Sequence, residues 1–126
     1  MPHTTIEYSG NLGDRLDVAD LLVRLHGVLT EVGGIDLTNC KSRAVASDTY
    51  LIGDGEERHA FVHADVRFLE GRSPGVKRAI GSGMLRVLQE FFRGDAKRFD
   101  LQLTVEIRDI HREAYFKLPE GTFTPQ

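Results

Sequence analysis

Two amphipathic segments with helical spacing, each between two segments of strand character, constrain the fold of this chain more than any other feature. The first repeats apolar residues at steps of three and four from Val18 to Val32, and Gly33-Gly34 follow it. The second does the same from Val76 to Phe92 and is followed by Gly94. The order strand, helix, strand therefore occurs twice, and the second copy begins near residue 59.

The segments between and around the predicted helices have the composition or the alternation of β-strands. They are residues 4–8, 40–46 with a continuation at 49–52, 60–69 and 101–108. The last two alternate apolar and polar side chains, which is typical of strands with one buried face. Gly53-Asp54-Gly55 predicts a turn before the third strand.

These segments predict an α/β (α+β) fold, in which four main strands form one sheet and two helices cover one of its faces. Each β-α-β crossover should be right-handed and should produce a parallel pair of strands. Because each helix has a single apolar side, both helices should lie on the same face of the sheet. The sequence contains no third layer, so we expect another copy of the chain to cover the other face.

The length of 126 residues fits a single domain, 1–126, and residues 110–126 form its C-terminal tail. The tail contains apolar side chains without a periodicity that could build a core of their own: Tyr115, Phe116, Leu118 and Phe123. Such a tail docks on its own domain or on a neighbouring subunit, and we favour the neighbouring subunit.

The overall charge and the cysteine content exclude several classes of protein. A net charge of −3 gives no general attraction to nucleic acid or to an anionic membrane. We find no apolar run of the roughly 18 residues that a membrane span needs, and no secretion signal at the N-terminus. Cys40 is the only cysteine, and no cysteine or histidine spacing suggests a metal site, so we expect a cytoplasmic protein.

The first candidate functional residue is Pro2. A methionine in front of proline is normally removed, which would leave a secondary amine at the terminus, held rigid by its ring and tied to the first strand. An ordered amine of this kind at the edge of a cavity can carry protons. On these residues alone, a start codon that happens to precede proline remains the alternative.

Three cations form the second group of candidates. Lys41 and Arg43 are two residues apart on a predicted strand and therefore point to the same face, where they are either solvated or bind an anion. Arg72 precedes Ser73 and Pro74, which are a suitable N-cap and first-turn residue. The start of a helix favours anions, so Arg72 is either an anion ligand or a loop residue facing solvent.

His63 and Asp65 also share one face of a predicted strand and could be mistaken for a catalytic pair. Side chains two apart on a strand more often line a polar surface, and we favour that interpretation here.

Residues that carry a resemblance to a known family extend over nearly the whole chain. They are Pro2-His3 with Glu7, Ser42-Arg43 with Asp48-Thr49, Ala60-Phe61-Val62-His63, Gly71-Arg72-Ser73 and Phe116-Lys117. No one of these motifs is diagnostic, but their spacing is specific when it is combined with the Met-Pro-His start and the two repeats. On these residues the chain resembles the tautomerase superfamily and, within it, the 5-carboxymethyl-2-hydroxymuconate Δ-isomerase family.

The resemblance implies a homotrimer that uses no cofactor and has Pro2 as its catalytic base. The family's substrate is a dienol tricarboxylate from the breakdown of aromatic rings, so the resemblance also implies a role in the homoprotocatechuate pathway. Lys41, Arg43 and Arg72 would bind its carboxylates. The family has an arginine at the position of Lys41, and lysine keeps the charge without the planar guanidinium.

Other functions remain compatible with the same pattern. One is a phenylpyruvate-type keto–enol tautomerase or a dehalogenase or hydratase, which would keep the fold and the proline. Another, from a different class, is a non-catalytic trimeric module that binds small anions. If Pro2 is not the base, His63 is the next candidate.

Overall fold

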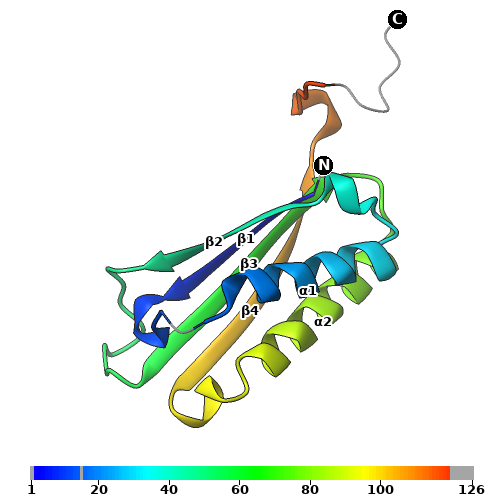
Figure 1. Cartoon of the computed structure of the whole chain (residues 1–126). Helices are drawn as coiled ribbons and strands as arrows, with labels where there is room; N and C mark the ends of the chain where they lie inside the picture. The colour runs from blue at the N-terminus through cyan, green and yellow to red at the C-terminus, as the bar shows by residue number, and fades with distance from the viewer. Residues whose placement is uncertain (1, 15, 120–126) are drawn as a thin grey trace, which may run out of the picture.

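The computed structural model describes residues 2–14 and 16–119, and its main elements follow the predicted order (Figure 1). They are β1 (His3–Ser9), α1 (Val18–Glu31), β2 (Lys41–Ser47), β3 (His59–Leu69), α2 (Pro74–Phe91) and β4 (Asp100–Ile110). Short 3₁₀ turns connect them, and one of these, η4 (Arg112–Ala114), follows β4.

The strands form one sheet in the order β2-β1-β3-β4. β1 pairs in parallel with β2, and β3 pairs in parallel with β4, so each β-α-β unit produces the predicted parallel pair. The two units meet through the antiparallel pair of β1 and β3. The N-terminal end of β1 therefore lies between the N-terminal end of β2 and the C-terminal end of β3, at the end of the sheet where β4 also ends.

Both helices cover the same face of the sheet, which confirms the predicted layers (Figure 1). Their apolar sides meet the inward side chains of β1 and β3 in one continuous core. The core residues at most 2% exposed include Leu21, Leu25 and Leu29 of α1, Ile80, Met84 and Leu88 of α2, Ile6 of β1, and Val62, Val66 and Phe68 of β3. Burial of one such side chain stabilises the fold by about 1.5–3 kcal/mol.

Local signals place the helix starts. The Asp17 carboxylate accepts a hydrogen bond from the backbone N–H of Asp20 at the start of α1. The Ser73 hydroxyl accepts one from Val76, and Pro74 is the first residue of α2. Helix α2 thus begins two residues before the predicted Val76.

The predicted continuation of the second strand at residues 49–52 is wrong. β2 ends at Ser47, which is paired with Ser9, the last residue of β1. Beyond that point β1 offers no backbone partner, and Leu51 is 79% exposed. Composition alone does not make a strand where the neighbouring strand has already ended.

The other face of the sheet, which we call the open face, is polar. It carries the side chains that alternate with the core residues along each strand, which are the apolar Val45 and Phe61 and a larger polar set: His3, Thr5, Glu7, Lys41, Arg43, His63, Asp65, Arg67, Gln102, Thr104, Glu106 and Arg108. The Asp65 carboxylate accepts hydrogen bonds from Arg67 at 3.3 Å and from Arg108 at 3.2 Å. A neighbouring copy against this face would meet charged groups rather than an apolar surface.

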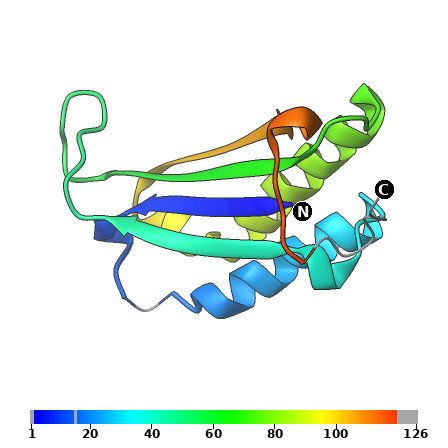
Figure 2. The same cartoon turned by 90° about the horizontal axis from the view of Figure 1, so that it is seen from above.

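The chain after β4 lies on the open-face side of the sheet. Figure 2 shows it crossing the ends of the strands next to the N-terminus. Phe116 and Leu118 are each 87% exposed, and Phe123 of the predicted tail lies outside the described residues. Docking of this tail on a neighbouring subunit stays a prediction. In the described part of the chain, neither helix is long and apolar enough to cross a membrane.

Candidate active site

Pro2 is buried and directly precedes β1. Its carbonyl oxygen accepts a hydrogen bond from the backbone N–H of Lys41 at 3.1 Å. The next residue, His3, is in register with Lys41 on one side and with Arg67 on the other. The backbone of Pro2 is therefore fixed by the sheet, as expected for an ordered terminus.

Arg72 lies at the same end of the sheet as Pro2. Its guanidinium carbon is 5.1 Å from the centre of the Phe68 ring. Phe68 directly follows Arg67, the register partner of His3, so this ring belongs to the strand next to Pro2. Arg72 forms no ion pair with another described residue. Its guanidinium donors therefore remain available for an anion.

Lys41 and Arg43 are both exposed and lie on the edge strand β2, on the same face as predicted. The Lys41 ammonium donates a hydrogen bond to the Asn39 carbonyl at 3.2 Å. Arg43 donates to the Thr5 hydroxyl at 3.4 Å. In the described part of the chain, neither cation forms an ion pair with a carboxylate.

The structure thus brings Pro2, Lys41 and Arg72 to one end of the sheet, and it places Arg43 two residues farther along β2, on the open face. There Arg43 lines a cavity of about 400 Å³ with His3, Thr5, Arg67, Ile110 and Tyr115. Sequence reasoning did not find this cavity, because its walls come from β1, β2, β3, the last residue of β4 and the segment after it.

His3 is the main functional candidate that sequence reasoning missed. Its Nε2 atom lies 2.9 Å from the Tyr115 hydroxyl oxygen, and the two rings meet edge to face. Burial, followed by the positive charge of Arg43, lowers the pKa of His3 below its usual value of 6.5. The imidazole is therefore neutral at pH 7. The one signal in the sequence that could have identified His3 as a site residue was its position next to Pro2 in the Pro2-His3 motif.

His63 and Asp65 do not form a catalytic pair. His63 Nδ1 lies 2.6 Å from the Thr104 hydroxyl oxygen, and its Nε2 lies 3.7 Å from a Glu106 oxygen. Asp65 instead binds the arginines at 67 and 108. Burial acts to raise the pKa of Asp65, but the hydrogen bonds from Arg108 and Arg67 outweigh it, so that pKa is lowered. Both residues belong to the polar surface of the open face.

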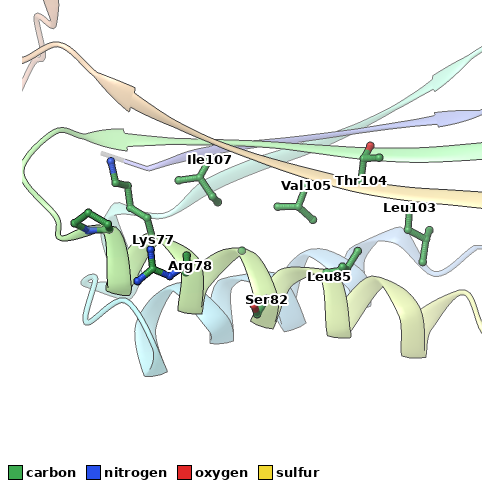
Figure 3. Close-up of a pocket in the computed structure, with 10 residues that line it drawn as sticks. Lys77, Arg78, Ser82, Leu85, Leu103, Thr104, Val105 and Ile107 are labelled. Atoms are coloured by element: carbon green, nitrogen blue, oxygen red, sulfur yellow. The ribbon is translucent and has the colours of Figure 1, made fainter.

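A larger groove, of about 590 Å³, lies between α2 and the edge strand β4 (Figure 3). Its apolar wall consists of Leu85, Leu103, Val105 and Ile107. Lys77 at its rim forms an ion pair with Asp109 at 3.2 Å. None of the four predicted site residues lines this groove. Among the described residues, no group of three or more His, Cys, Asp or Glu side chains could hold a metal ion.

Two β-α-β units joined through an antiparallel strand pair, with Pro2 held at the start of the first strand, define the class of protein. This is the fold of the tautomerase superfamily. A fused 4-OT wild-type symmetric trimer has the same fold, with a TM-score of 0.75 and 18% identity over 93% of this chain and 92% of that one. At that identity the likeness shows the fold alone.

Closer similarity gives the family. The family model described as 5-carboxymethyl-2-hydroxymuconate isomerase matches residues 2–120. A 5-carboxymethyl-2-hydroxymuconate Delta-isomerase of Escherichia coli is 27% identical over 117 residues, 93% of each chain. A crystal structure of a 5-carboxymethyl-2-hydroxymuconate isomerase from Deinococcus radiodurans R1 has a TM-score of 0.85 and 30% identity, covering 92% of this chain and 87% of that one. The chain belongs to the 5-carboxymethyl-2-hydroxymuconate isomerase family, and its enzyme class is isomerase.

Proposed function

We propose that this protein is a cofactor-free isomerase of a carboxylated dienol, such as 5-carboxymethyl-2-hydroxymuconate in the degradation of aromatic compounds, with the Pro2 amine as general base. The observation that carries the proposal is the position of Pro2, which is buried and bonded to the backbone of Lys41 at the end of the sheet where Arg72 also lies. The names of the similar proteins support the choice of substrate.

The proposed reaction moves one proton and rearranges two double bonds. The neutral Pro2 amine takes the proton of the 2-hydroxyl group, and the electrons of that O–H bond form the C2 carbonyl. The C2=C3 pair shifts to C3=C4, and the C4=C5 pair takes the proton back from Pro2 at C5. The base and the acid are therefore the same group, which must be unprotonated before the reaction begins.

The surroundings of Pro2 suit this role. An ordinary secondary amine is protonated at pH 7, but burial and nearby cations both disfavour a second positive charge. Lys41, whose backbone N–H bonds the Pro2 carbonyl, and Arg72 supply two cations at this end of the sheet. We assign them, together with Arg43, to the substrate carboxylates, where they also stabilise the negative charge of the dienolate.

We also propose that the protein acts as a homotrimer in the cytoplasm. Two fused 4-OT proteins of the same fold are described as symmetric trimers. The exposed Phe116 and Leu118 at the end of the described chain are apolar side chains that an adjacent subunit would cover. The charged open face would then face water or charged groups of the other subunits.

The decisive experiment compares the protein with and without Met1. Intact-mass spectrometry of the protein purified from its natural host identifies the terminal residue, and loss of the dienol absorbance measures isomerisation. We expect protein that begins at Pro2 to be active. Protein with Met1 attached should be inactive, because the nitrogen of Pro2 is then an amide without a basic lone pair.

Full activity of protein that demonstrably retains Met1 would refute the proline mechanism. Equal activity on a monocarboxylate such as phenylpyruvate would favour the keto–enol tautomerase alternative over the tricarboxylate isomerase.

A further inference from the structure

The cavity on the open face is separate from Pro2, Lys41 and Arg72, because none of these three residues lines it. Its six lining residues are His3, Thr5, Arg43, Arg67, Ile110 and Tyr115. Two of them are arginines, two carry hydroxyl groups, and none is a carboxylate. With a volume of about 400 Å³, the cavity is large enough for a small organic acid.

Of the two arginines that line the cavity, Arg67 forms an ion pair with Asp65, whereas Arg43 forms none with the other described residues. The Asp65 carboxylate, next to Thr5 in the strand register, lies against both Arg67 and Arg108. Glu106 lies 3.7 Å from Arg108, and Glu7 accepts a hydrogen bond from Ser47 at 2.6 Å. These carboxylates lie on the open face, and none of them lines the cavity. Within the described part of the chain, the hydrogen-bond partner of the Arg43 side chain is the neutral Thr5 hydroxyl, at 3.4 Å.

Tyr115 forms one wall of the cavity through a contact that crosses the whole chain. It lies 112 residues from His3 in sequence, and its hydroxyl oxygen is 2.9 Å from the imidazole Nε2. Figure 2 shows the segment that carries Tyr115 turning over the ends of the strands on this side. Tyr115 and Arg43 both line the cavity, and the hydroxyl can donate to a ligand when it accepts its bond from the Nε2–H tautomer of His3.

From this geometry we infer that the cavity binds a small carboxylate, with Arg43 as the charged ligand and the Tyr115 hydroxyl as a second donor. A guanidinium and a hydroxyl group converging on one space are suited to the two oxygens of a carboxylate. Ile110 provides the apolar wall against which a methylene chain can lie. The carboxylate belongs either to the substrate, in which case the assignment rests on the proposed function, or to a separate small acid.

Calorimetric titration with glutarate tests the cavity without any turnover. We expect wild-type protein to bind glutarate, and Arg43→Gln and Tyr115→Phe each to weaken binding by about tenfold or more. Arg86→Gln on the exposed side of α2 is the matched control for loss of one positive charge, and it should bind as wild type does. Circular dichroism and the urea midpoint of each variant verify that it is folded.

Two further variants separate this inference from the proposed function. Arg72→Ala and Pro2→Ala should keep glutarate binding at the cavity even if they abolish isomerisation. If glutarate inhibits the isomerase competitively, the cavity holds a substrate carboxylate, and if it inhibits non-competitively, the cavity holds a separate acid. Either pattern supports a carboxylate site.

The inference is overturned if wild-type protein does not bind glutarate at millimolar concentration. It is also overturned if Arg43→Gln and Tyr115→Phe bind as tightly as wild type, or if Arg72→Ala alone removes binding, because the anion would then sit at the Pro2 end of the sheet.

Discussion

Replacement of Arg72 by alanine should separate substrate binding from stability. In the folded protein the guanidinium stacks on the Phe68 ring at 5.1 Å and forms no ion pair with another described residue. A partly exposed cation–π contact contributes about 0.5–1 kcal/mol, which sets the expected loss in the free energy of unfolding. A charge-assisted hydrogen bond to a carboxylate contributes more, about 1.5–3 kcal/mol.

The binding loss corresponds to a rise of roughly 10- to 150-fold in KM for a multiply carboxylated substrate, because about 1.4 kcal/mol is a factor of ten. Urea unfolding measures the stability term, and initial rates over a range of substrate concentrations measure KM and kcat. The KM of Arg72→Lys should lie between the KM values of the wild type and of Arg72→Ala, because lysine keeps the charge but loses the planar pair of donors. Arg86→Ala on the exposed side of α2 is the control and should change neither quantity.

A variant with unchanged KM and kcat would show that Arg72 is a loop residue that packs on Phe68. A loss of several kcal/mol in the free energy of unfolding would also refute the argument, because the contact of Arg72 with Phe68 would then serve mainly to stabilise the fold.

Four other predictions follow from the same structure. Pro2→Ala keeps a terminal amine but loses its rigid ring, so turnover should fall by about 10²–10⁴-fold in kinetic assays while the circular dichroism spectrum stays the same. Leu25→Ala removes a side chain that is 0% exposed in the core, and chemical denaturation should show a loss of about 2–5 kcal/mol; a loss below about 1 kcal/mol would contradict the described packing. Burial lowers the pKa of both His3, where Arg43 adds to the effect, and His26, which lies 2.7 Å from the Ser42 hydroxyl oxygen. As the pH falls, the unfolded chain therefore binds more protons than the folded protein. Urea midpoints should be highest above about pH 6.5 and should decrease as the pH falls through 6.5 and then through the lowered pKa values of the two folded histidines. Equal midpoints at about pH 5.5 and 7.5 would refute this. Analytical ultracentrifugation should give three times the chain mass of 14.1 kDa, and a monomer at micromolar concentration would exclude the trimer.

The order of elements, the layers and the helix starts could be read from the sequence, because local physics decides them. The apolar spacing of Leu21, Leu25 and Leu29 specifies one buried side of a helix wherever that helix packs. Ser73 followed by Pro74 marks a helix start through groups that lie within one turn. Pro2, Lys41, Arg43 and Arg72 could be named as candidates from residue type and from resemblance.

Only the tertiary structure decided which candidates meet. The end of β2 at Ser47 depends on where β1 ends, so residues 49–52 lack a partner that composition cannot supply. Arg72 reaches the Pro2 end because the antiparallel register of β1 and β3 brings Phe68 there. The cavity around Arg43 and Tyr115 joins residues from every strand, and the contact of Tyr115 with His3 links positions 112 residues apart. Contacts of this kind depend on the closing of long loops by the packing of the whole sheet, and no local pattern in the sequence records them.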